Sequence, residues 1–245
     1  MQIKVLLFAT LKEIARESQI TLILPTDTAT VREVREALTQ RFPNIEAHVN
    51  AAIAALNEEY AFNEEILRDG DSIAFFPPVS GGAPDDEAAS PWPEIYLLPD
   101  APIDHDEIVA SITTAETGAV CFFSGMVRGK TQRDGHLPET QFLEYEAYTP
   151  MALAKMRQVA AEIRARWPLV QGIAIAQRVG KIGVGQNTVL IACSSAHRDD
   201  GCFEAARYGI DRLKEIVPVW KKEISPAGAA WIEGHYTPTP ADRTE

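Results

Sequence analysis

One segment divides this chain: Ser72-Ile73-Ala74-Phe75-Phe76-Pro77-Pro78-Val79-Ser80-Gly81-Gly82. Its apolar run before the prolines is typical of a buried strand. Pro77 and Pro78 end that strand, because proline has no N–H to donate to a sheet. The glycine pair allows two interpretations. It is a flexible hinge, or it is a tail that threads a channel too narrow for side chains and ends, once the chain is cut, in a reactive carboxylate.

The residues after the glycine pair predict a linker. Residues 83–93 are acidic, rich in proline, alanine and serine, and show no periodicity. Fully extended, such a segment spans at most about 38 Å. We therefore expect two domains, residues 1–82 and 94–236, followed by a flexible Pro/Thr-rich tail at 237–245.

The segment before the glycine pair predicts a small mixed domain. Apolar runs at 3–8, 20–24 and 51–57 are expected to be strands. A helix is expected to begin after Thr30, because Thr30 and Glu33 have capping-box spacing. The helical spacing is carried by Val31, Val34, Leu38 and Phe42. A sheet of four or five strands packed on one helix fits a segment of this length.

The larger segment mixes strands and helices. Buried or half-buried strands are predicted at 118–125, 141–148, 172–177 and 188–194. Helices are predicted from Pro150, at a first helical position, to Trp167, and from Cys202 to Ile216. An irregular stretch is expected after the second helix. The predicted class is α+β.

Composition excludes several classes of protein. The chain has 245 residues, 46% of them hydrophobic, and a net charge of −12, which argues against nucleic-acid binding. No apolar run is long enough for a membrane span, and no signal peptide is recognised, so a cytoplasmic protein is expected. The three cysteines form no CxxC or His/Cys cluster, so no metal site is expected.

The second half of the chain nevertheless groups its cations near strand ends and one helix start. These are Arg128, Lys130, Arg133, His197, Arg198, Arg207, Lys214, Lys221 and Lys222. They form either a solvated basic surface or an anion site, since such positions bind anions. A partly shielded lysine beside other cations has a lowered pKa and can act as base or nucleophile.

Two further patterns stay open. Cys202 stands near the start of a predicted helix, where a thiolate is favoured, so a persulfide relay is an alternative to a simple buried thiol. Glu144 and Glu146 share one side of a predicted strand. They are expected to be solvated or to form salt bridges.

The motifs resemble those of one family. Residues 1–82 resemble the small, ubiquitin-like sulfur-carrier subunit of molybdopterin synthase, and residues from about 93 to 236 resemble its large catalytic subunit. The matching stretches of the larger segment are Phe123-Ser124-Gly125-Met126-Val127-Arg128, Glu144-Tyr145-Glu146-Ala147-Tyr148, Arg178-Val179-Gly180, Ser194-Ser195-Ala196-His197-Arg198 and Trp220-Lys221-Lys222-Glu223. The resemblance implies a natural fusion, with a β-grasp domain in front of an α/β large-subunit domain.

The resemblance also implies a reaction. Gly82 would carry sulfur as a thiocarboxylate, made by a separate ATP-dependent adenylating enzyme and a sulfur donor. The sulfur would pass to cyclic pyranopterin monophosphate (precursor Z), giving the dithiolene of molybdopterin, with no permanently bound cofactor. Because Ala83 occupies the carboxyl group of Gly82, the chain would first be cut between Gly82 and Ala83.

Residue roles follow from the same resemblance. Lys214 and Lys221 match active-site lysines. The positions expected to bind substrate are Arg128, His197, Arg198, Lys222 and His235, the last standing where an arginine is common. The large subunit implies a homodimer through the C-terminal domain. The alternative is a non-catalytic, dimeric pterin-binding scaffold with a tethered ubiquitin-like interaction module.

Overall fold

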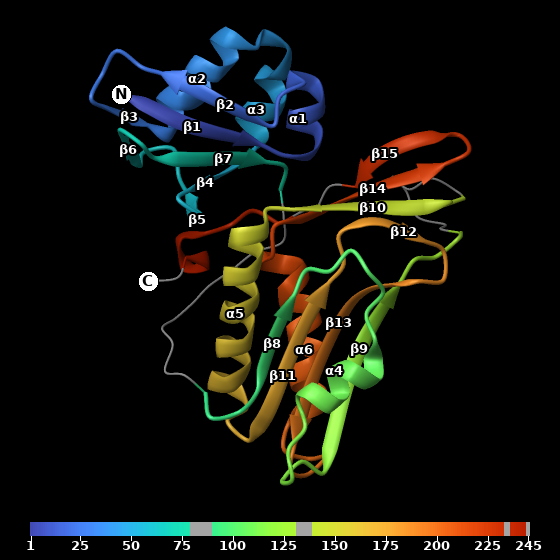
Figure 1. Ribbon diagram of the computed structural model, residues 1–245. Coiled ribbons are helices and arrows are strands. Elements are labelled where there is room, and N and C mark those ends of the chain that lie inside the picture. The colour runs from blue at the N-terminus through green and yellow to red at the C-terminus, as the bar shows by residue number, and fades with distance from the viewer. Residues whose placement is uncertain (79–89, 131–138, 233–235, 244–245) are drawn as a thin grey trace.

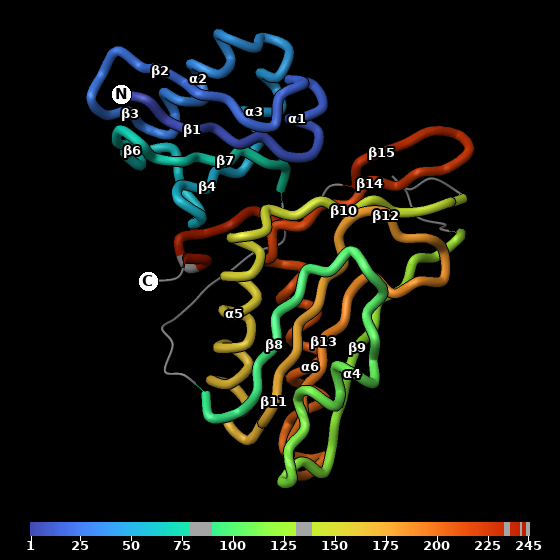
Figure 2. Tube along the Cα trace, viewed as in Figure 1, coloured from blue at the N-terminus to red at the C-terminus, as the bar shows by residue number. Residues whose placement is uncertain are grey.

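The structure is a computed structural model that describes residues 1–78, 90–130, 139–232 and 236–243. Two domains are stacked end to end (Figure 1 and Figure 2). The front domain comprises residues 1–78, and the back domain comprises the described residues from 90 onward. Among the residues described, no helix has the length and apolar character that a membrane crossing requires.

Five strands form the mixed sheet of the front domain: β1 (Gln2–Leu7), β2 (Gln19–Ile23), β4 (Ile53–Leu56), β5 (Glu59–Ala61) and β7 (Ser72–Phe76). Their order is β2-β1-β7-β4-β5. β1 and β7 run parallel at the centre, with Val5 opposite Ile73. The other neighbours are antiparallel. This pairing of the first strand with the last is the predicted ubiquitin-like β-grasp arrangement.

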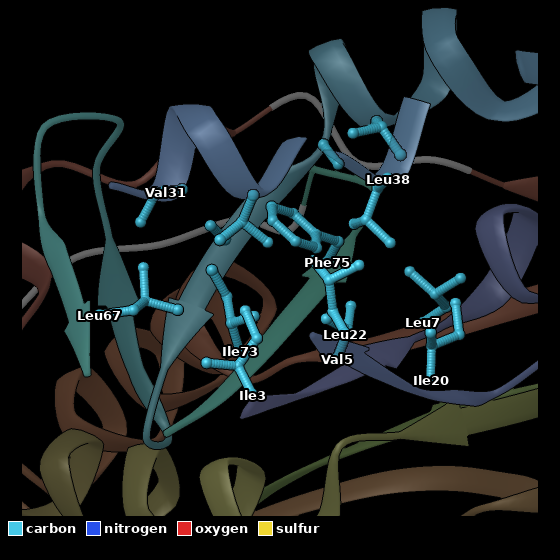
Figure 3. Close-up of a cluster of buried hydrophobic side chains, with 14 of the residues drawn as sticks. Ile3, Val5, Leu7, Ile20, Leu22, Val31, Leu38, Leu67, Ile73 and Phe75 are labelled. Carbon is cyan, nitrogen blue, oxygen red and sulfur yellow. The ribbon is translucent and has the colours of Figure 1, made fainter. Parts of the chain in front are cut away.

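Helix α2 (Val31–Arg41) packs on this sheet and is capped as predicted. Glu33 N donates to Thr30 Oγ1 over 3.3 Å, and Thr30 N donates to Glu33 Oε2 over 2.6 Å. Val31, Val34 and Leu38 of its apolar stripe are fully buried, and Phe42, just after the helix, is partly buried. Figure 3 shows Leu38 in one cluster with Phe75 of β7, so the capping box and the stripe together fix where this helix begins and which side it buries.

Two short helices of the front domain are not predicted by the sequence patterns: α1 (Ala9–Ala15) and α3 (Glu46–Ala51). α1 buries only Ala9 and Leu11, too few positions for a helical period to stand out. The remaining elements are β3 (Thr28–Thr30), β6 (Ile66–Arg68) and a 3₁₀ turn at Pro43–Ile45. Of these additions, α1 matters most, because it contacts the back domain.

Two four-stranded sheets form the back domain. The first contains, in spatial order, β8 (Glu94–Leu97), β11 (Val170–Gln177), β13 (Asn187–Ser195) and β9 (Ala119–Met126). The second contains β12 (Gly180–Gly183), β10 (Phe142–Ala147), β14 (Val219–Ser225) and β15 (Gly228–Ile232). Only β8 and β11 pair in parallel. The second sheet lies between the front domain and the first sheet (Figure 1).

The helices cover both faces of the first sheet. α5 (Thr149–Arg166) and α6 (Cys202–Ile216) pack on one face, and α4 (His105–Ser111) packs on the other. α5 and α6 confirm the two predicted helices. The stretch expected to be irregular after α6 is instead largely strand β14, because residues 219–225 pair with both β10 and β15. The predicted α+β class is confirmed.

The C-terminal segment differs from its prediction. The expected flexible tail at 237–245 is packed where the structure describes it. Asp242 is fully buried, and Arg243 Nε donates to the backbone oxygen of Tyr60 over 2.7 Å. Local composition is rich in proline and threonine and carries no periodicity. The packing depends on partners far away in sequence, which is why the sequence pattern misses it.

Candidate active site

A cavity of about 490 Å³ lies where the two sheets of the back domain meet. Its walls come from the ends of β9 and β13, from β10 and β14, and from the last turn of α6. Pro78, the last described residue of the front domain before the glycine pair, also lines it. The chain that leaves the front domain therefore reaches the edge of this cavity.

Three of the predicted cations line the cavity together: Arg128, Lys214 and Lys221. Arg128 follows β9, Lys214 stands in the last turn of α6, and Lys221 lies on β14. The Lys214 Nζ lies 5.8 Å from the centre of the Phe123 ring, which places a cavity wall beside it. Three elements that are distant in sequence thus bring three positive charges to one space, as an anion site requires.

Lys221 differs electrostatically from an ordinary surface lysine. Burial lowers its pKa, and the nearby positive charges of Lys214 and Arg128 lower it further. The Glu223 carboxylate opposes this shift. A larger fraction of Lys221 is therefore neutral near neutral pH than for a solvated lysine, which suits a group that accepts and returns a proton.

Two cavity residues have no role in the sequence analysis. Glu223 is almost fully buried and accepts a hydrogen bond from Thr140 Oγ1. Tyr145 of β10 also lines the cavity, and burial raises the pKa of its hydroxyl. A signal for Glu223 exists in the sequence, because strand alternation places it on the same face of β14 as Lys221. That signal requires recognising residues 219–225 as a strand.

Lys222 is not in the cavity, contrary to its predicted role in substrate binding. Neighbouring residues of a strand point to opposite faces, so Lys222 faces the front domain when Lys221 faces the cavity. There Lys222 Nζ forms an ion pair with Glu13 of α1. Lys12 of α1 forms a second pair with Glu146, at 2.6 Å. The salt bridge considered for Glu146 therefore exists, and it joins the two domains.

His197 and Arg198 are also outside this cavity. Thr188 and Val189, near the start of β13, line it, whereas His197 and Arg198 follow the other end of that strand and are exposed. At 3.3 Å per residue the two ends are roughly 25 Å apart. One chain therefore does not bring its own His197 and Arg198 to its own cavity.

Cys202 is a buried thiol. It is 1% exposed, and its Sγ lies 3.8 Å from the backbone oxygen of Arg198. It stands at the first turn of α6, whereas Lys214 stands at the last turn. A persulfide relay requires a sulfur that reaches both donor and acceptor, and this position offers neither access nor proximity to the cavity.

Three predicted site residues lie outside the described part of the chain: Gly82, Ala83 and His235. The described contacts nearest to the glycine pair hold the last residues of the front domain. Trp220 Nε1 donates to the backbone oxygen of Pro77 over 3.4 Å. Trp220 also packs against Phe76, with ring centroids 5.2 Å apart. These contacts position the chain immediately before it reaches the cavity.

Comparisons with known proteins agree with this two-part architecture. A model of the ThiS family matches residues 5–82, and a model of the MoaE protein matches residues 98–216. The molybdopterin synthase catalytic subunit of Nostoc sp. is 44% identical over 138 residues, or 56% of this chain and 81% of the relative. The Bacillus subtilis protein of the same name is 40% identical over 139 residues, or 57% and 85%.

A solved structure extends the likeness to three dimensions. The crystal structure of molybdopterin synthase from Staphylococcus aureus matches with a TM-score of 0.51 and 41% sequence identity. The match covers 57% of this chain and 96% of that chain. The chain belongs to the molybdopterin synthase catalytic subunit family and carries a ThiS-family domain ahead of it in the same polypeptide.

Proposed function

We propose that this chain transfers sulfur from a thiocarboxylate on Gly82 to cyclic pyranopterin monophosphate, forming the dithiolene of molybdopterin. One observation carries the proposal: Pro78 lines the same cavity as Lys214 and Lys221. Gly82 is four residues further along the chain, a reach of at most about 14 Å. The sulfur and the lysines are thus able to meet without movement of the front domain.

The cavity residues divide the chemistry between them. Arg128 and Lys214 supply positive charge for the phosphate of the substrate and for the thiocarboxylate. The thiocarboxylate sulfur attacks a carbon of the substrate, and a C–O bond at that carbon breaks, so that its oxygen leaves with a proton. Water then attacks the Gly82 carbonyl carbon and breaks its bond to sulfur, which stays on the substrate. Lys221 moves the protons, and Lys214 holds the acyl group. Gly82 leaves as a carboxylate, and a second charged carrier delivers the second sulfur.

The fusion requires one further step. Gly82 has no free carboxylate while Ala83 is attached, so we propose that the chain is cut between them. A separate adenylating enzyme and sulfur donor then charge the new terminus. The intact mass of protein from its native host tests this step. A fragment ending at Gly82, part of it with sulfur in place of one oxygen, is expected, whereas a sulfur-competent but wholly uncut chain contradicts it.

We also infer a homodimer through the back domain. Strand β9 is at the edge of the first sheet and leaves Phe122 and Phe123 46% and 38% exposed. Exposed aromatic side chains on an edge strand favour pairing with a second copy. Such pairing also gives His197 and Arg198 a role, because they are then available to the cavity of the partner subunit. His235 is assigned to the same substrate-binding surface.

The substitution Lys221→Ala distinguishes this enzyme from a pterin-binding scaffold, the alternative that the comparisons do not favour. A general acid–base group is worth about 10²–10⁴-fold in rate. We expect a loss of that size in single-turnover conversion of cyclic pyranopterin monophosphate, with the fold retained. Lys4→Ala, on the exposed face of β1, is the matched control and is expected to leave the rate unchanged. An unchanged rate in Lys221→Ala contradicts the proposal.

A further inference from the structure

Lys155 of α5 is fully buried at the boundary between the two domains. Its Nζ donates to both carboxylate oxygens of Glu59 in β5, at 2.8 and 3.0 Å. It also donates to Gln158 Oε1 and to the backbone oxygen of Asp242, each at 3.0 Å. A buried ammonium requires a partner for each of its N–H groups. Lys155 therefore joins the front domain, α5 and the C-terminal segment at one point.

The C-terminal segment, residues 236–243, contacts the front domain a second time. Arg243 Nε donates to the backbone oxygen of Tyr60 over 2.7 Å, and its guanidinium pairs with the carboxylate of Glu65. The same guanidinium lies 5.0 Å from the centre of the Phe62 ring. All three contacts are made within or just after β5. Figure 1 shows this end of the chain beside β5 and the start of α5.

A buried polar network holds the C-terminal segment on the back domain. Asp242 is fully buried, and its Oδ1 lies 4.0 Å from an Arg212 nitrogen. Arg212 of α6 donates to both carboxylate oxygens of Glu162, at 2.6 and 2.9 Å. Gln158 donates to the same carboxylate at 3.2 Å. Since Gln158 also accepts from Lys155, the network is continuous from α6 through the C-terminal segment to the front domain.

We propose that residues 236–243 form a strap that retains the front domain on the back domain of its own chain, including after the chain is cut behind Gly82. The strap is fastened to the back domain at Asp242 and to the front domain at Arg243. Its use in sulfur delivery rests on the proposed function, but the retention itself does not. The partner recognised by this surface is thus the carrier domain of the same chain.

The proposal follows from the contacts that are lost when the front domain separates from the back domain. Removing the front domain breaks the ion pair between Lys155 and the Glu59 carboxylate, a charge pair at the boundary whose loss is expected to slow dissociation. The Tyr60 hydroxyl, which donates to the backbone oxygen of Ile216 over 3.0 Å, loses its acceptor as well. Arg243 loses its contacts with Tyr60 and Glu65. These losses slow the release of the front domain.

The test uses the full chain with a protease recognition sequence inserted between residues 86 and 87. Cut chains grown with ¹⁵N are mixed with unlabelled cut chains. Native mass spectrometry then follows single pairs of one front and one back domain, released from the assembly, in which only one of the two domains is labelled. We expect removal of residues 236–245 to accelerate this exchange by about 100-fold, and Arg243→Ala by about 10-fold, as for central contacts of an interface. Arg207→Ala is the matched control, because this side chain is 87% exposed and pairs with Asp211 of the same helix.

The outcomes separate the strap from the sulfur chemistry. Exchange of both the truncated and the Arg243→Ala chains within about twofold of the unaltered chain overturns the proposal. If circular dichroism shows that the truncated chain is unfolded, Arg243→Ala and Glu65→Gln decide the question alone. No sulfur or substrate is present, so Lys221→Ala is expected to exchange normally. Failure of the proposed function would thus leave this measurement unaffected.

Discussion

The indole N–H of Trp220 donates to the backbone oxygen of Pro77 over 3.4 Å. The same ring stacks on Phe8 of the front domain, with centroids 5.3 Å apart. Lys221, the next residue, lies on the opposite face of β14 and lines the cavity. Trp220 itself lines the cavity edge beside Pro78, so one strand both binds the incoming chain and presents a cation to the cavity, which couples docking of the front domain to the geometry of the site.

Two substitutions at Trp220 are expected to separate packing from hydrogen bonding. Trp220→Ala removes a buried aromatic ring and is expected to lower the free energy of unfolding by about 3–5 kcal/mol. Trp220→Phe keeps most of the ring and loses the N–H donor, which is expected to cost about 1 kcal/mol. Urea denaturation measures both. Equal losses in the two variants would mean that ring packing contributes little.

The pKa of Lys221 is expected to respond to its neighbours. Arg128→Met removes a positive charge that lowers this pKa, so the pKa should rise toward the usual ~10.4. NMR titration of the Lys221 side chain measures the shift directly. Lys4→Met, far from the cavity, is the control. The lowered pKa also affects stability. Keeping Lys221 protonated in the folded state lowers the free energy of unfolding at neutral pH, and this penalty disappears as the pH rises from the folded-state pKa to the unfolded-state pKa.

Lys222 and Lys221 are expected to differ although they are adjacent. Lys222→Ala removes an ion pair with Glu13 and no cavity contact, so the KM for cyclic pyranopterin monophosphate should change by less than about twofold. Lys221→Ala should reduce the rate by orders of magnitude. Steady-state kinetics of the two variants decides this. A large KM effect in Lys222→Ala would restore the substrate-binding role that the sequence suggested.

Acid is expected to weaken docking of the front domain through Glu13. The hydrogen bond from Lys222 lowers the pKa of Glu13 below its usual ~4.3. The stabilising contribution is therefore complete above that usual value and is lost as the pH falls through the lowered pKa. Because Glu13 is 44% exposed, solvent screening keeps the effect below about 1 kcal/mol. Urea denaturation of Glu13→Gln and unaltered chains between pH 3 and 7 measures it, and equal pH dependence contradicts it.

Mixing two inactive variants tests whether His197 and Arg198 serve the partner subunit. In a heterodimer of Lys221→Ala and Arg198→Ala chains, one cavity then has both residues intact. Random pairing makes about half of the dimers mixed, so about a quarter of the unaltered activity should return. If each chain used its own Arg198, both cavities would stay defective. Mixing Lys221→Ala with Lys214→Ala, two residues that each chain supplies to its own cavity, is the control and should restore no activity, because both cavities of the mixed dimer stay defective.

Much of the fold is visible in the sequence because local signals suffice for it. The capping box at Thr30 and Glu33 marks the start of α2, and Pro77 and Pro78 mark the end of β7. The helix α6 has the predicted bounds, Cys202–Ile216, since its apolar stripe is regular. By contrast α1 was beyond prediction, because a helix of seven residues with two buried side chains carries too little periodicity.

For the candidate site, too, local signals predict some features and not others. Residue type and motif identified Arg128, Lys214 and Lys221, and the structure brings these three together. Motif alone also assigned Lys222 to the substrate, whereas strand alternation turns it toward the front domain. His197 and Arg198 resemble site residues equally well, yet they follow the end of β13 that is far from the cavity. A motif specifies which residues are present, and only the path of the chain specifies where each side chain points.

Local patterns predict the two domains, the α+β class and the cationic character of the site, because these follow from periodicity, turn residues and charge along the chain. Tertiary structure alone decided which face of β14 meets the cavity, how α1 meets the second sheet, and that the segment around Asp242 and Arg243 packs on the front domain. Those features depend on contacts between residues more than 80 positions apart, such as Lys155 with Glu59 and Asp242. No local pattern encodes such contacts.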